Sequence, residues 1–512
     1  MRETAIISRA NHYFKIHGFY EQFVVNVIKP FCRIHLCKTA KRPVPGTRRQ
    51  QWVVTHVFAR SNPQKTEFRL PIELFKEFIE YATYRGYNQS RFKIEEVPVI
   101  PGKKVHFEFN PGFENQRPGQ HEWTDYMLEP GHLKINNAST GNGKTYMSIY
   151  TMVKTGERTI ATMQPRYIFN FVKELYKVVK LDPGDILMWE QDLSVLHEVL
   201  KRGDYDPKII IIPMSRIEVY LRHEKENRDQ PPLEEIIEAI QPGLRIIDEG
   251  HEAIHQIFLS LLYGNINKVV VLSATLKADD PFTNKVYKWL YPPRYRLKDA
   301  EPEHYIDVVA YLYRMNLRKH RVKTEQFGGY NDKAFEESIL KSEALTRFYF
   351  ELVEKAFREY YLNRRREGTK CFFFFSRVNM CYAMLEMFKA KYPDMDIETF
   401  TGDDSKKKEL KDKYLRHEVI ITTPNSCGTG KDMPGLITAI CAHSVSSTQS
   451  NKQIIGRLRD TAKMFNGELP PIFVFTVCVD IDKQVEYLGK REVAFADKQK
   501  SFKRINSECS LD

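Results

Sequence analysis

The sequence predicts an α/β protein in which two parallel-sheet domains in tandem follow a small α+β domain. The main observation is a series of short apolar runs, each followed by a stretch with helical spacing of apolar residues. The first series comprises "HLKINN", "RTIATMQP", "KIIIIPMS", "GLRIIDE" and "KVVVLSAT"; the second comprises "TKCFFFFSR", "DIETFTG", "HEVIITTP", "ITAICAHSV" and "PIFVFTVCV". Continuous apolar runs of this length are typical of strands that are buried on both faces of a parallel sheet.

The N-terminal region has a different pattern. We expect strands in "FVVNVIKPFCRIHLC" and "QQWVVTHVFAR", a helix in "PIELFKEFIEYATYRGY", and a strand in "GKKVHFEFN" before turn-rich sequence. The predicted domains are therefore residues 1–110 (α+β), 111–305 (α/β) and 306–490 (α/β). The last stretch, residues 491–512, is expected to form a basic helix and a frayed tail.

The chain carries an excess of positive charge. Its 512 residues include 78 Lys and Arg against 66 Asp and Glu, which gives a formal net charge of +12. Such an excess favours a polyanionic partner, because binding to phosphates gains both Coulomb energy and released counterions. Charge alone leaves open the other interpretation, a basic enzyme without a nucleic-acid partner.

Cysteine spacing and hydropathy indicate the cellular compartment in which the protein is expected. The eight Cys residues include no CxxC pair, so neither a zinc ribbon nor a thioredoxin-like redox motif is indicated. The first residues carry charges where a secretory peptide needs an apolar stretch, and no apolar run is long enough to span a bilayer. We expect a soluble cytoplasmic protein with reduced thiols and no membrane partner.

The stretch "NNASTGNGKTYMSIY" at 136–150 predicts a phosphate-binding loop. A strand that ends near Asn136, a loop of small residues and a helix from Lys144 would aim backbone N–H groups at one anion. Lys144 would then reach the β- and γ-phosphates, and the Thr145 hydroxyl would bind Mg²⁺. Ala138 stands where the general pattern has Gly, and the alternative is an ordinary Gly-rich turn before a helix. The predicted nucleotide-binding residues are Ser139, Thr140, Gly141, Asn142, Gly143, Lys144 and Thr145.

A pair of carboxylates follows the apolar run in "GLRIIDEGHEAIHQ". We expect Asp248 to hold Mg²⁺ together with Thr145, and Glu249 to polarise the attacking water. His251 is spaced to sense the γ-phosphate. A zinc pair of His251 and His255 is a weaker interpretation, because HExxH spacing and a third ligand are lacking.

Three further segments with hydroxyl, glycine or arginine residues follow these two along the chain. "VVVLSATLK" offers Ser273 and Thr275 as a hydroxyl link between nucleotide state and domain closure. "TTPNSCGTGKDMPG" and "KQIIGRLRD" follow in the second α/β region, and Arg side chains near a γ-phosphate can be supplied across a domain interface. The ordinary explanation of the arginines is a basic helix face. The candidates here are Thr423, Gly430, Asp432, Gln453, Arg457 and Arg459.

Taken together, these segments resemble helicase superfamily 2 of the DExH type. "ASTGNGKT" is similar to motif I, "DEGH" to motif II, "SAT" to motif III, "FFFFSR" to motif IV, "GTGKDMP" to motif V and "QIIGRLR" to motif VI. The resemblance implies two RecA-like motor domains that use ATP and Mg²⁺. It also implies that Gln120 in "RPGQHEW" reads adenine, and that Arg166 in "TMQPRYIF" lies near a nucleic-acid phosphate. Arg377 and Thr423 are the corresponding nucleic-acid candidates of the second domain.

Within the superfamily the chain is most similar to the phage UvsW-like group, which is related in action to RecG. The domain of residues 1–110 before the motor resembles that group's DNA-binding module and is expected to bind nucleic acid. Together with "AHSVSSTQSNKQIIGR", it carries this narrower resemblance. It implies ATP-driven remodelling of branched DNA, such as branch migration, fork regression and unwinding, in recombination, repair or replication. The expected partners are DNA junctions and RNA–DNA hybrids, for a monomer or weak oligomer in a bacterial or phage-infected cytoplasm.

Motif VI departs from the family pattern. The usual form is QxxGRxxR, whereas here the second Arg comes one position early, at Arg459, and Asp460 takes its place. The sequence leaves open whether Arg457 or Arg459 acts as the finger. An RNA helicase, a double-strand translocase without strand separation, and a nucleic-acid clamp with a relic ATP site are the competing interpretations.

Overall fold

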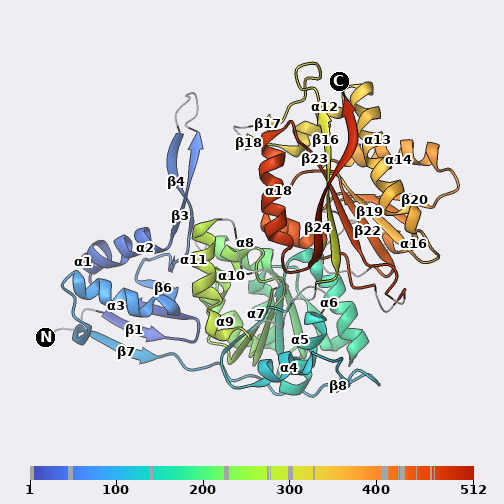
Figure 1. The fold of residues 1–512 in the computed structure, drawn as a ribbon. Helices are drawn as coiled ribbons and strands as arrows, with labels where there is room; N and C mark the ends of the chain where they lie inside the picture. Colours follow the sequence, from blue (N-terminus) through green and yellow to red (C-terminus); the bar gives the residue numbers. More distant parts are fainter. Residues whose placement is uncertain are drawn as a thin grey trace. The chain divides into compact units, whose positions relative to one another are not determined.

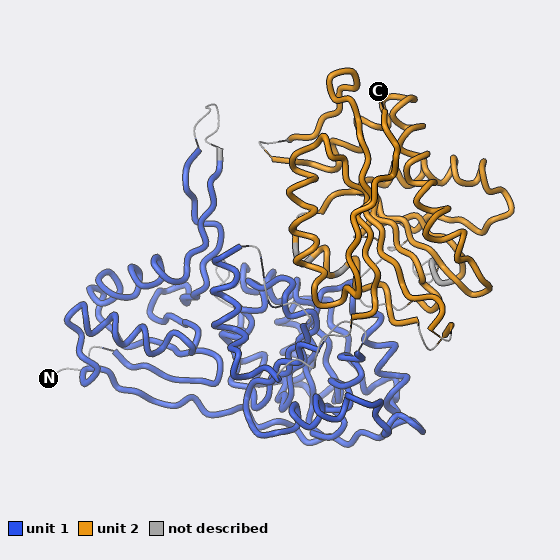
Figure 2. Tube along the Cα trace, in the orientation of Figure 1, with its two compact units in different colours: residues 1–299 blue, residues 300–512 orange. Residues whose placement is uncertain are grey.

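The protein forms two compact units in a computed structural model, Met1–Asp299 and Ala300–Asp512, shown separately coloured in Figure 2. The structure describes residues 5–43, 50–138, 142–223, 230–273, 276, 278, 280–297, 304–326, 329–402, 404, 413–424, 426, 433–445, 447–461, 464–465 and 467–511. Within this part of the chain, no helix is both long and apolar enough to cross a membrane.

The first unit begins with a five-stranded sheet in the order β5-β6-β2-β1-β7. Strand β1 pairs antiparallel with β2 and parallel with β7. The strands are β1 (Ala5–Arg9), β2 (Tyr13–His17), β5 (Arg60–Ser61), β6 (Glu67–Pro71) and β7 (Phe92–Glu96). The expected helix is confirmed as α3 (Phe75–Tyr84), which follows the short 3-10 helix η2 (Ile72–Leu74).

The strand that we expected in "FVVNVIKPFCRIHLC" is wrong. This stretch is helical, as α1 (Glu21–Phe23), a π-helical turn η1 (Val24–Ile28) and α2 (Lys29–His35). The buried side chains Phe23, Val27, Ile28 and Phe31 recur at helical spacing and so line one face of the helix. The β-branched residues suggested a strand, but packing of this face against the sheet decides the conformation.

A two-stranded hairpin leaves this N-terminal domain. Its strands β3 (Cys37–Pro43) and β4 (Gln50–Val57) pair antiparallel with each other and belong to no larger sheet, and β4 confirms the strand expected in "QQWVVTHVFAR". Figure 1 shows the hairpin extending away from the helices and sheets of the first unit.

The remainder of the first unit is an α/β domain around a six-stranded sheet, in the order β12-β13-β10-β14-β15-β9. All of its neighbouring strands pair in parallel. The strands are β9 (Leu133–Asn136), β10 (Thr159–Met163), β12 (Ile186–Met188), β13 (Ile209–Pro213), β14 (Leu244–Ile247) and β15 (Lys268–Leu272). The helices are α4 (His121–Leu128), α5 (Lys144–Thr155), α6 (Pro165–Val178), α7 (Leu193–Arg202), α8 (Met214–His223), α9 (Leu233–Ile240), α10 (Ile254–Leu261) and α11 (Pro281–Leu290). Of the strand expected in "GKKVHFEFN", only β8 (Glu108–Phe109) forms, paired with β11 (Val179–Lys180).

Alternate residues of each strand face two separate cores, which is why the strands read as continuous apolar runs. In β13, Ile209 and Ile211 belong to a core with α4, α5 and α6, whereas Ile210 and Ile212 belong to a core with α7 to α11. The second of these cores also contains the aromatic residues of the N-terminal domain, Phe14 among them. The N-terminal domain is therefore packed against one helical layer of the first α/β domain.

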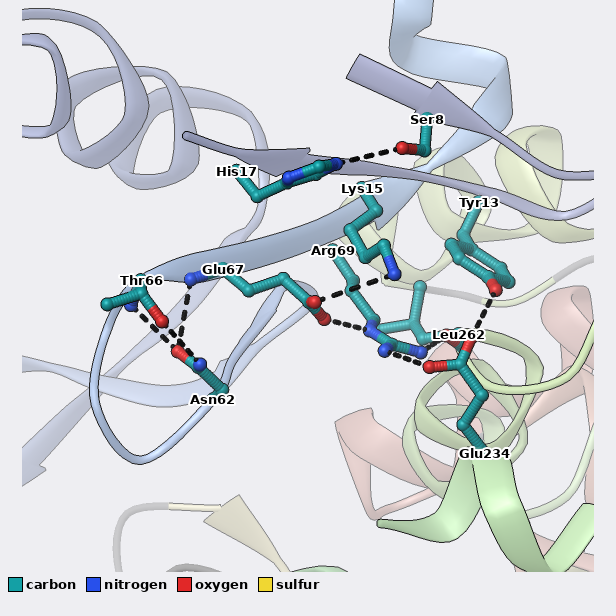
Figure 3. A network of polar contacts seen from close by, with 10 residues as sticks. All are labelled: Ser8, Tyr13, Lys15, His17, Asn62, Thr66, Glu67, Arg69, Glu234 and Leu262. Carbon is teal, nitrogen blue, oxygen red and sulfur yellow. Dashed lines mark hydrogen bonds and ion pairs between the residues drawn. The ribbon is translucent and has the colours of Figure 1, made fainter. Parts of the chain in front are cut away.

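A polar network reinforces this packing (Figure 3). Arg69 of β6 donates hydrogen bonds to Glu67 at 2.6 Å, to the carbonyl of Leu262 at 3.0 Å and to Glu234 of α9 at 2.5 Å. Tyr13 donates to the other carboxylate oxygen of Glu234 at 3.1 Å. Because Arg69 is only 6% exposed, its charge depends on these carboxylates in place of water.

The second unit contains a seven-stranded sheet, in the order β20-β21-β19-β22-β23-β16-β24, with every neighbouring pair parallel. The strands are β16 (Ile306–Met315), β19 (Lys370–Phe374), β20 (Ile397–Phe400), β21 (Val419–Thr422), β22 (Leu436–Cys441), β23 (Ile472–Cys478) and β24 (Gln499–Leu511). The helices are α12 (Asp332–Leu340), α13 (Glu343–Tyr360), α14 (Val378–Lys391), α16 (Lys413–Arg416), α17 (Thr448–Ile455) and α18 (Asp482–Phe495); a two-stranded ribbon, β17 (Glu325–Gln326) and β18 (Gly329–Tyr330), precedes α12.

Both faces of this sheet are covered as well. Phe373 of β19 packs in a core with α12, α13 and α14, while Phe372 and Phe374 pack in a core with α17 and α18. The predicted fold class, two tandem parallel-sheet α/β domains after a small α+β domain, is confirmed.

The expected frayed C-terminal tail is wrong. Residues 499–511 form the edge strand β24, paired in parallel with β16 over most of its length. Phe502 contributes to one core and Ile505, Cys509 and Leu511 to the other. The apolar residues are spread among Lys, Arg and Ser, so the stretch lacks the continuous pattern of the other strands.

Candidate functional site

Three segments far apart in the sequence meet at one edge of the six-stranded sheet. Strands β14, β15 and β9 are parallel neighbours, so the residues that follow them emerge on the same side. Backbone bonds join the segments: Gly250 N–H donates to Leu272 at 2.9 Å, and Ser273 N–H donates to Asn136 at 3.0 Å. The "ASTGNGKT", "DEGH" and "SAT" segments are thus brought together. Ser139, Thr140, Gly141 and Thr275 lie outside the described residues.

Gly143 closes the loop before helix α5 in a conformation that other residues rarely adopt. Its φ is +77°, and a Cβ at this position would come within 2.5 Å of Nε2 of Gln120. That same nitrogen donates to the carbonyl of Asn142 at 3.0 Å, while Oε1 of Gln120 accepts from Arg117 N–H at 3.1 Å. Gln120 therefore supports the end of the loop through its side chain.

Lys144 and Thr145 begin helix α5, which runs for 12 residues. The Lys144 ammonium donates to the carbonyl of Ala138 at 3.0 Å, and Ala138 is 3% exposed. The Lys144 side chain thus turns back toward Ala138, where the chain leaves β9. A positive charge at a helix start suits a phosphate anion.

Asp248 and Glu249 follow β14 directly. Glu249 N–H donates to Oδ1 of Asp248 at 2.9 Å, and Glu249 has a φ of +48°, which turns the chain sharply after the strand. Burial, and next the charge of Glu249, raise the pKa of Asp248, while the hydrogen bond from Glu249 N–H and the charge of Lys144 oppose the shift.

Asp248 and Thr145 carry side chains of the kind that bind Mg²⁺. A carboxylate and the Thr145 hydroxyl are oxygen ligands, which Mg²⁺ prefers. Among the described residues, no group of three His, Cys, Asp or Glu side chains could hold a metal. Mg²⁺ in nucleotide sites typically takes one or two protein ligands and completes its shell with phosphates and water, so the residues present match that kind of site and not a zinc site.

His251 connects the carboxylate loop to the segment after β15. Its Nδ1 lies 3.0 Å from Oγ of Ser273 and 3.3 Å from Oε2 of Glu249. Burial lowers the pKa of His251, although Glu249 and Glu252 oppose the shift, so the ring favours its neutral form. His255 is directed elsewhere: its Nε2 lies 3.0 Å from the carbonyl of Val57.

Gly250 was not singled out from the sequence, yet the loop depends on it. A Cβ there would approach Cγ1 of Val271 to 2.4 Å and the hydroxyl of Tyr291 to 3.1 Å. The Tyr291 hydroxyl donates to the Gly250 carbonyl at 2.6 Å. Only the sheet packing around Val271 reveals this requirement.

Glu252 is a second residue that sequence reasoning missed. It accepts from the Tyr167 hydroxyl at 2.7 Å and forms an ion pair with Arg166. The Arg166 side chain, 53% exposed, is thereby held beside the carboxylate loop at the start of α6. The partners are 86 residues apart, so no local pattern could have indicated the contact.

In the second unit, Arg377 and Thr423 follow β19 and β21. The N–H groups of Ser376 and Arg377 both donate to the buried carboxylate of Glu336, at 2.7 and 2.8 Å, and Nη1 of Arg377 lies 3.0 Å from Glu337. The Thr423 hydroxyl lies 2.6 Å from that of Ser426. Gly430 and Asp432 lie outside the described residues.

The shifted arginine of "QIIGRLRD" is not helical. Helix α17 ends at Ile455, Arg457 N–H donates to the Ile454 carbonyl at 3.1 Å in the turn that follows, and Arg459 lies beyond it. A guanidinium nitrogen of Arg459 donates back to the Gly456 carbonyl. A shifted helical turn therefore does not explain the register. The side chain of Gln453 is outside the described part of the chain.

Comparison with known proteins gives a likeness of structure alone. No family model matches the chain, and no curated protein matches it. The fold is similar to S. cerevisiae Dbp5 bound to RNA and ADP BeF3, with 13% identity, TM-score 0.49, and 77% of this chain and 90% of that chain covered. It is similar to Mss116p bound to ssRNA and AMP-PNP, with 18% identity, TM-score 0.48, and 76% and 74% covered. It is also similar to the Pyrococcus furiosus Hef helicase domain, with 13% identity, TM-score 0.42, and 73% and 98% covered.

Proposed function

We propose that the chain is an ATP-dependent helicase or translocase that acts on nucleic acid. The observation that supports this most strongly is the meeting of Lys144, the Asp248–Glu249 pair and the His251–Ser273 contact at one sheet edge. A phosphate-binding helix start alone would suit many nucleotide-binding proteins. A second carboxylate beside the metal-binding one adds the means to activate water, and the histidine contact adds a route for reporting the nucleotide state.

In this proposal different residues of the chain bind the nucleotide, hydrolyse it and respond to its loss. Lys144 and the loop N–H groups bind the β- and γ-phosphates, and Gln120 reads the adenine. Thr145 and Asp248 would hold Mg²⁺, which would offset the charge that develops on the transferred phosphoryl group. Glu249 accepts the proton of the attacking water. His251 and Ser273 respond to loss of the γ-phosphate, and the second α/β domain supplies Arg457 or Arg459 to the transition state.

The nucleic-acid part of the proposal is supported by charge. The net charge of +12 favours a polyanion, and Arg166, Arg377 and Thr423 are the proposed backbone contacts. Such contacts read phosphates and not bases, so we expect binding to weaken steeply with salt. Affinity that stays flat from low to physiological salt would contradict this part.

The finer proposal is remodelling of branched DNA by a monomer or weak oligomer of a bacterial or phage-infected cytoplasm, with the N-terminal domain selecting the junction. It rests on the resemblance of the motif set to the UvsW-like group of superfamily 2. The test compares ATPase stimulation and product formation on four-way junctions, forks, single strands and RNA duplexes. Preference for junctions supports the proposal. Strongest stimulation by single-stranded RNA would favour an RNA helicase, and stimulation by duplex without strand separation would favour a translocase.

A further inference from the structure

The hairpin of β3 and β4 exposes a large aromatic side chain to solvent. Trp52 is 67% exposed, and Val54 on the same face is 53% exposed. Two-stranded ribbons without a covered face are marginally stable, and exposed apolar area of this kind costs free energy in water. The exposed Trp52 and Val54 together offer an apolar surface that another molecule can cover.

The base of the hairpin is anchored to the first α/β domain. Lys38 forms an ion pair with Asp280 at 2.7 Å, next to the start of α11, and donates to Thr283 at 3.2 Å. Phe58, just after β4, is 2% exposed and packs against Phe258 and Phe282. Beyond this anchored base, the two strands extend from the first unit in Figure 1.

Charge decides which class of partner fits. In β3 and β4, as the structure describes them, Lys38, Lys41 and Arg42 are present and there is no Asp or Glu. Lys41 is the cross-strand partner of Trp52, and its ammonium lies 5.4 Å from the centre of a Trp52 ring. Arg42 faces Gln51 in the next pair of the register. A cation beside an exposed aromatic ring, on two strands whose described residues include no Asp or Glu, is a combination with which proteins bind unpaired nucleic-acid strands.

We propose that the β3–β4 hairpin is a nucleic-acid-binding arm, in which Trp52 stacks on an unpaired base while Lys41 and Arg42 contact the flanking phosphates. This inference rests on the proposed function and adds the element that touches the unpaired strand. Stacking is insensitive to base identity, so the arm would recognise single-stranded character next to a duplex and not a sequence.

Tryptophan fluorescence tests the arm directly. The chain has four Trp, and the other three, Trp123, Trp189 and Trp289, are 5, 8 and 9% exposed. A forked oligonucleotide with single-stranded arms should therefore quench the emission of Trp52 selectively. The quench should be lost in Trp52→Phe, which keeps a stacking ring and most of the affinity. DNA and RNA arms are titrated separately to tell which strand the arm accepts.

Binding measurements complete the test. Trp52→Ala should weaken fork binding by about 5- to 100-fold, the usual effect of removing one stacked aromatic. Tyr84→Ala is the matched control, since Tyr84 of α3 is 85% exposed but lies off the hairpin, and it should bind as the wild type does. The double variant Lys41→Ala, Arg42→Ala should reduce the slope of log affinity against log salt by about 1.4, or 0.7 for each lost phosphate contact.

The outcomes distinguish failure of the proposed arm from failure of the proposed ATP-dependent function. If forks stimulate wild-type ATPase but Trp52→Ala binds them equally well, or if no quench occurs, the arm is wrong and the motor proposal stands. If no nucleic acid stimulates the wild-type ATPase, the proposed function itself is wrong. A duplex without unpaired bases is the last comparison. If it quenches Trp52 emission, and if Trp52→Ala binds it more weakly than the wild type does, stacking on an unpaired base is contradicted.

Discussion

Nδ1 of His251 lies 3.0 Å from Oγ of Ser273, which joins the loop after β14 to the segment after β15. The same ring nitrogen lies 3.3 Å from Glu249, the proposed water-activating group. A change at the γ-phosphate can therefore reach the β15 segment through a single side chain. We propose that this contact links ATP hydrolysis to movement of the protein.

Removing the Ser273 hydroxyl should uncouple ATP hydrolysis from its stimulation by nucleic acid. We expect Ser273→Ala to lower the ratio of nucleic-acid-stimulated to basal ATP turnover by about tenfold, within the 5- to 150-fold range of typical coupling energies. The measurement is steady-state ATPase with and without a fork. Ser194→Ala changes a half-buried serine of α7 in the same domain, whose hydroxyl donates to Asp192 at 2.6 Å; it is the control and should keep the wild-type ratio. An unchanged ratio in Ser273→Ala would remove the proposed link.

Gly143→Ala should impair nucleotide binding more than its backbone strain alone requires. The left-handed conformation costs an L-residue about 1–2 kcal/mol, and in addition the new Cβ must displace Gln120 from the loop. We expect ATP affinity to fall by more than about tenfold in an equilibrium titration. Gly203→Ala is a close control, because Gly203 has a φ of +75° with no atom within 4 Å of the added Cβ. Equal ATP affinity in the two variants would contradict the role assigned to the Gln120 contact.

Much of the site was predictable because chemistry at strand ends has a local signature. Lys144 and Asp248 each follow an apolar run, and parallel strands bring such ends together. The contacts that refine the site were not predictable. Gln120 meets the Asn142 carbonyl 22 residues away, and Glu252 meets Arg166 across 86 residues. Such pairs follow from the packing of helices on the sheet and leave no periodic trace in the sequence.

The fold was predictable to a similar degree. Buried parallel strands were found because both of their faces are apolar. The helix over 21–35 was missed because its β-branched residues resemble a strand, and β24 was missed because an edge strand needs few apolar residues. In both cases tertiary packing, and not local propensity, determines the conformation.

The Arg69–Glu234 contact predicts an acid-sensitive junction between the N-terminal domain and the first α/β domain. Burial raises the pKa of Glu234, but the charge and hydrogen bond of Arg69 outweigh it, so the pKa lies below its usual value of 4.5. The stabilisation is therefore complete above about pH 4.5 and is lost as the pH falls through the lowered pKa. We expect Glu234→Gln to be less stable than the wild type by about 1–3 kcal/mol at neutral pH, because Arg69 loses a charged partner. Thermal melts of the two proteins should converge as the medium becomes acidic.

The control for this comparison is Glu80→Gln, which alters an exposed carboxylate of α3 whose side chain is 64% exposed. Its melting temperature should follow that of the wild type at every pH. A constant difference between Glu234→Gln and the wild type down to acidic pH would show that the Glu234 carboxylate does not carry the predicted dependence.

The two arginines of "QIIGRLRD" should differ in effect. Arg459 donates to the Gly456 carbonyl and so stabilises the end of α17, whereas Arg457 lies in the turn directly after the helix. We propose Arg457 as the finger and expect Arg457→Ala to lower stimulated kcat by about 10³-fold or more, with little change in ATP affinity. Arg459→Ala should lower kcat by less than about tenfold. Single-turnover ATPase distinguishes the two, and the reverse order of effects would assign the finger to Arg459.

The central claim is that Glu249 activates water for ATP hydrolysis at this sheet edge. Glu249→Gln keeps the shape of the side chain and removes its ability to accept a proton. The decisive measurement is ATP binding and ATP turnover of this variant, taken side by side with the wild type. The account predicts ATP affinity close to that of the wild type and turnover reduced by at least about 10²-fold, the usual contribution of a general base. Turnover equal to that of the wild type would contradict it.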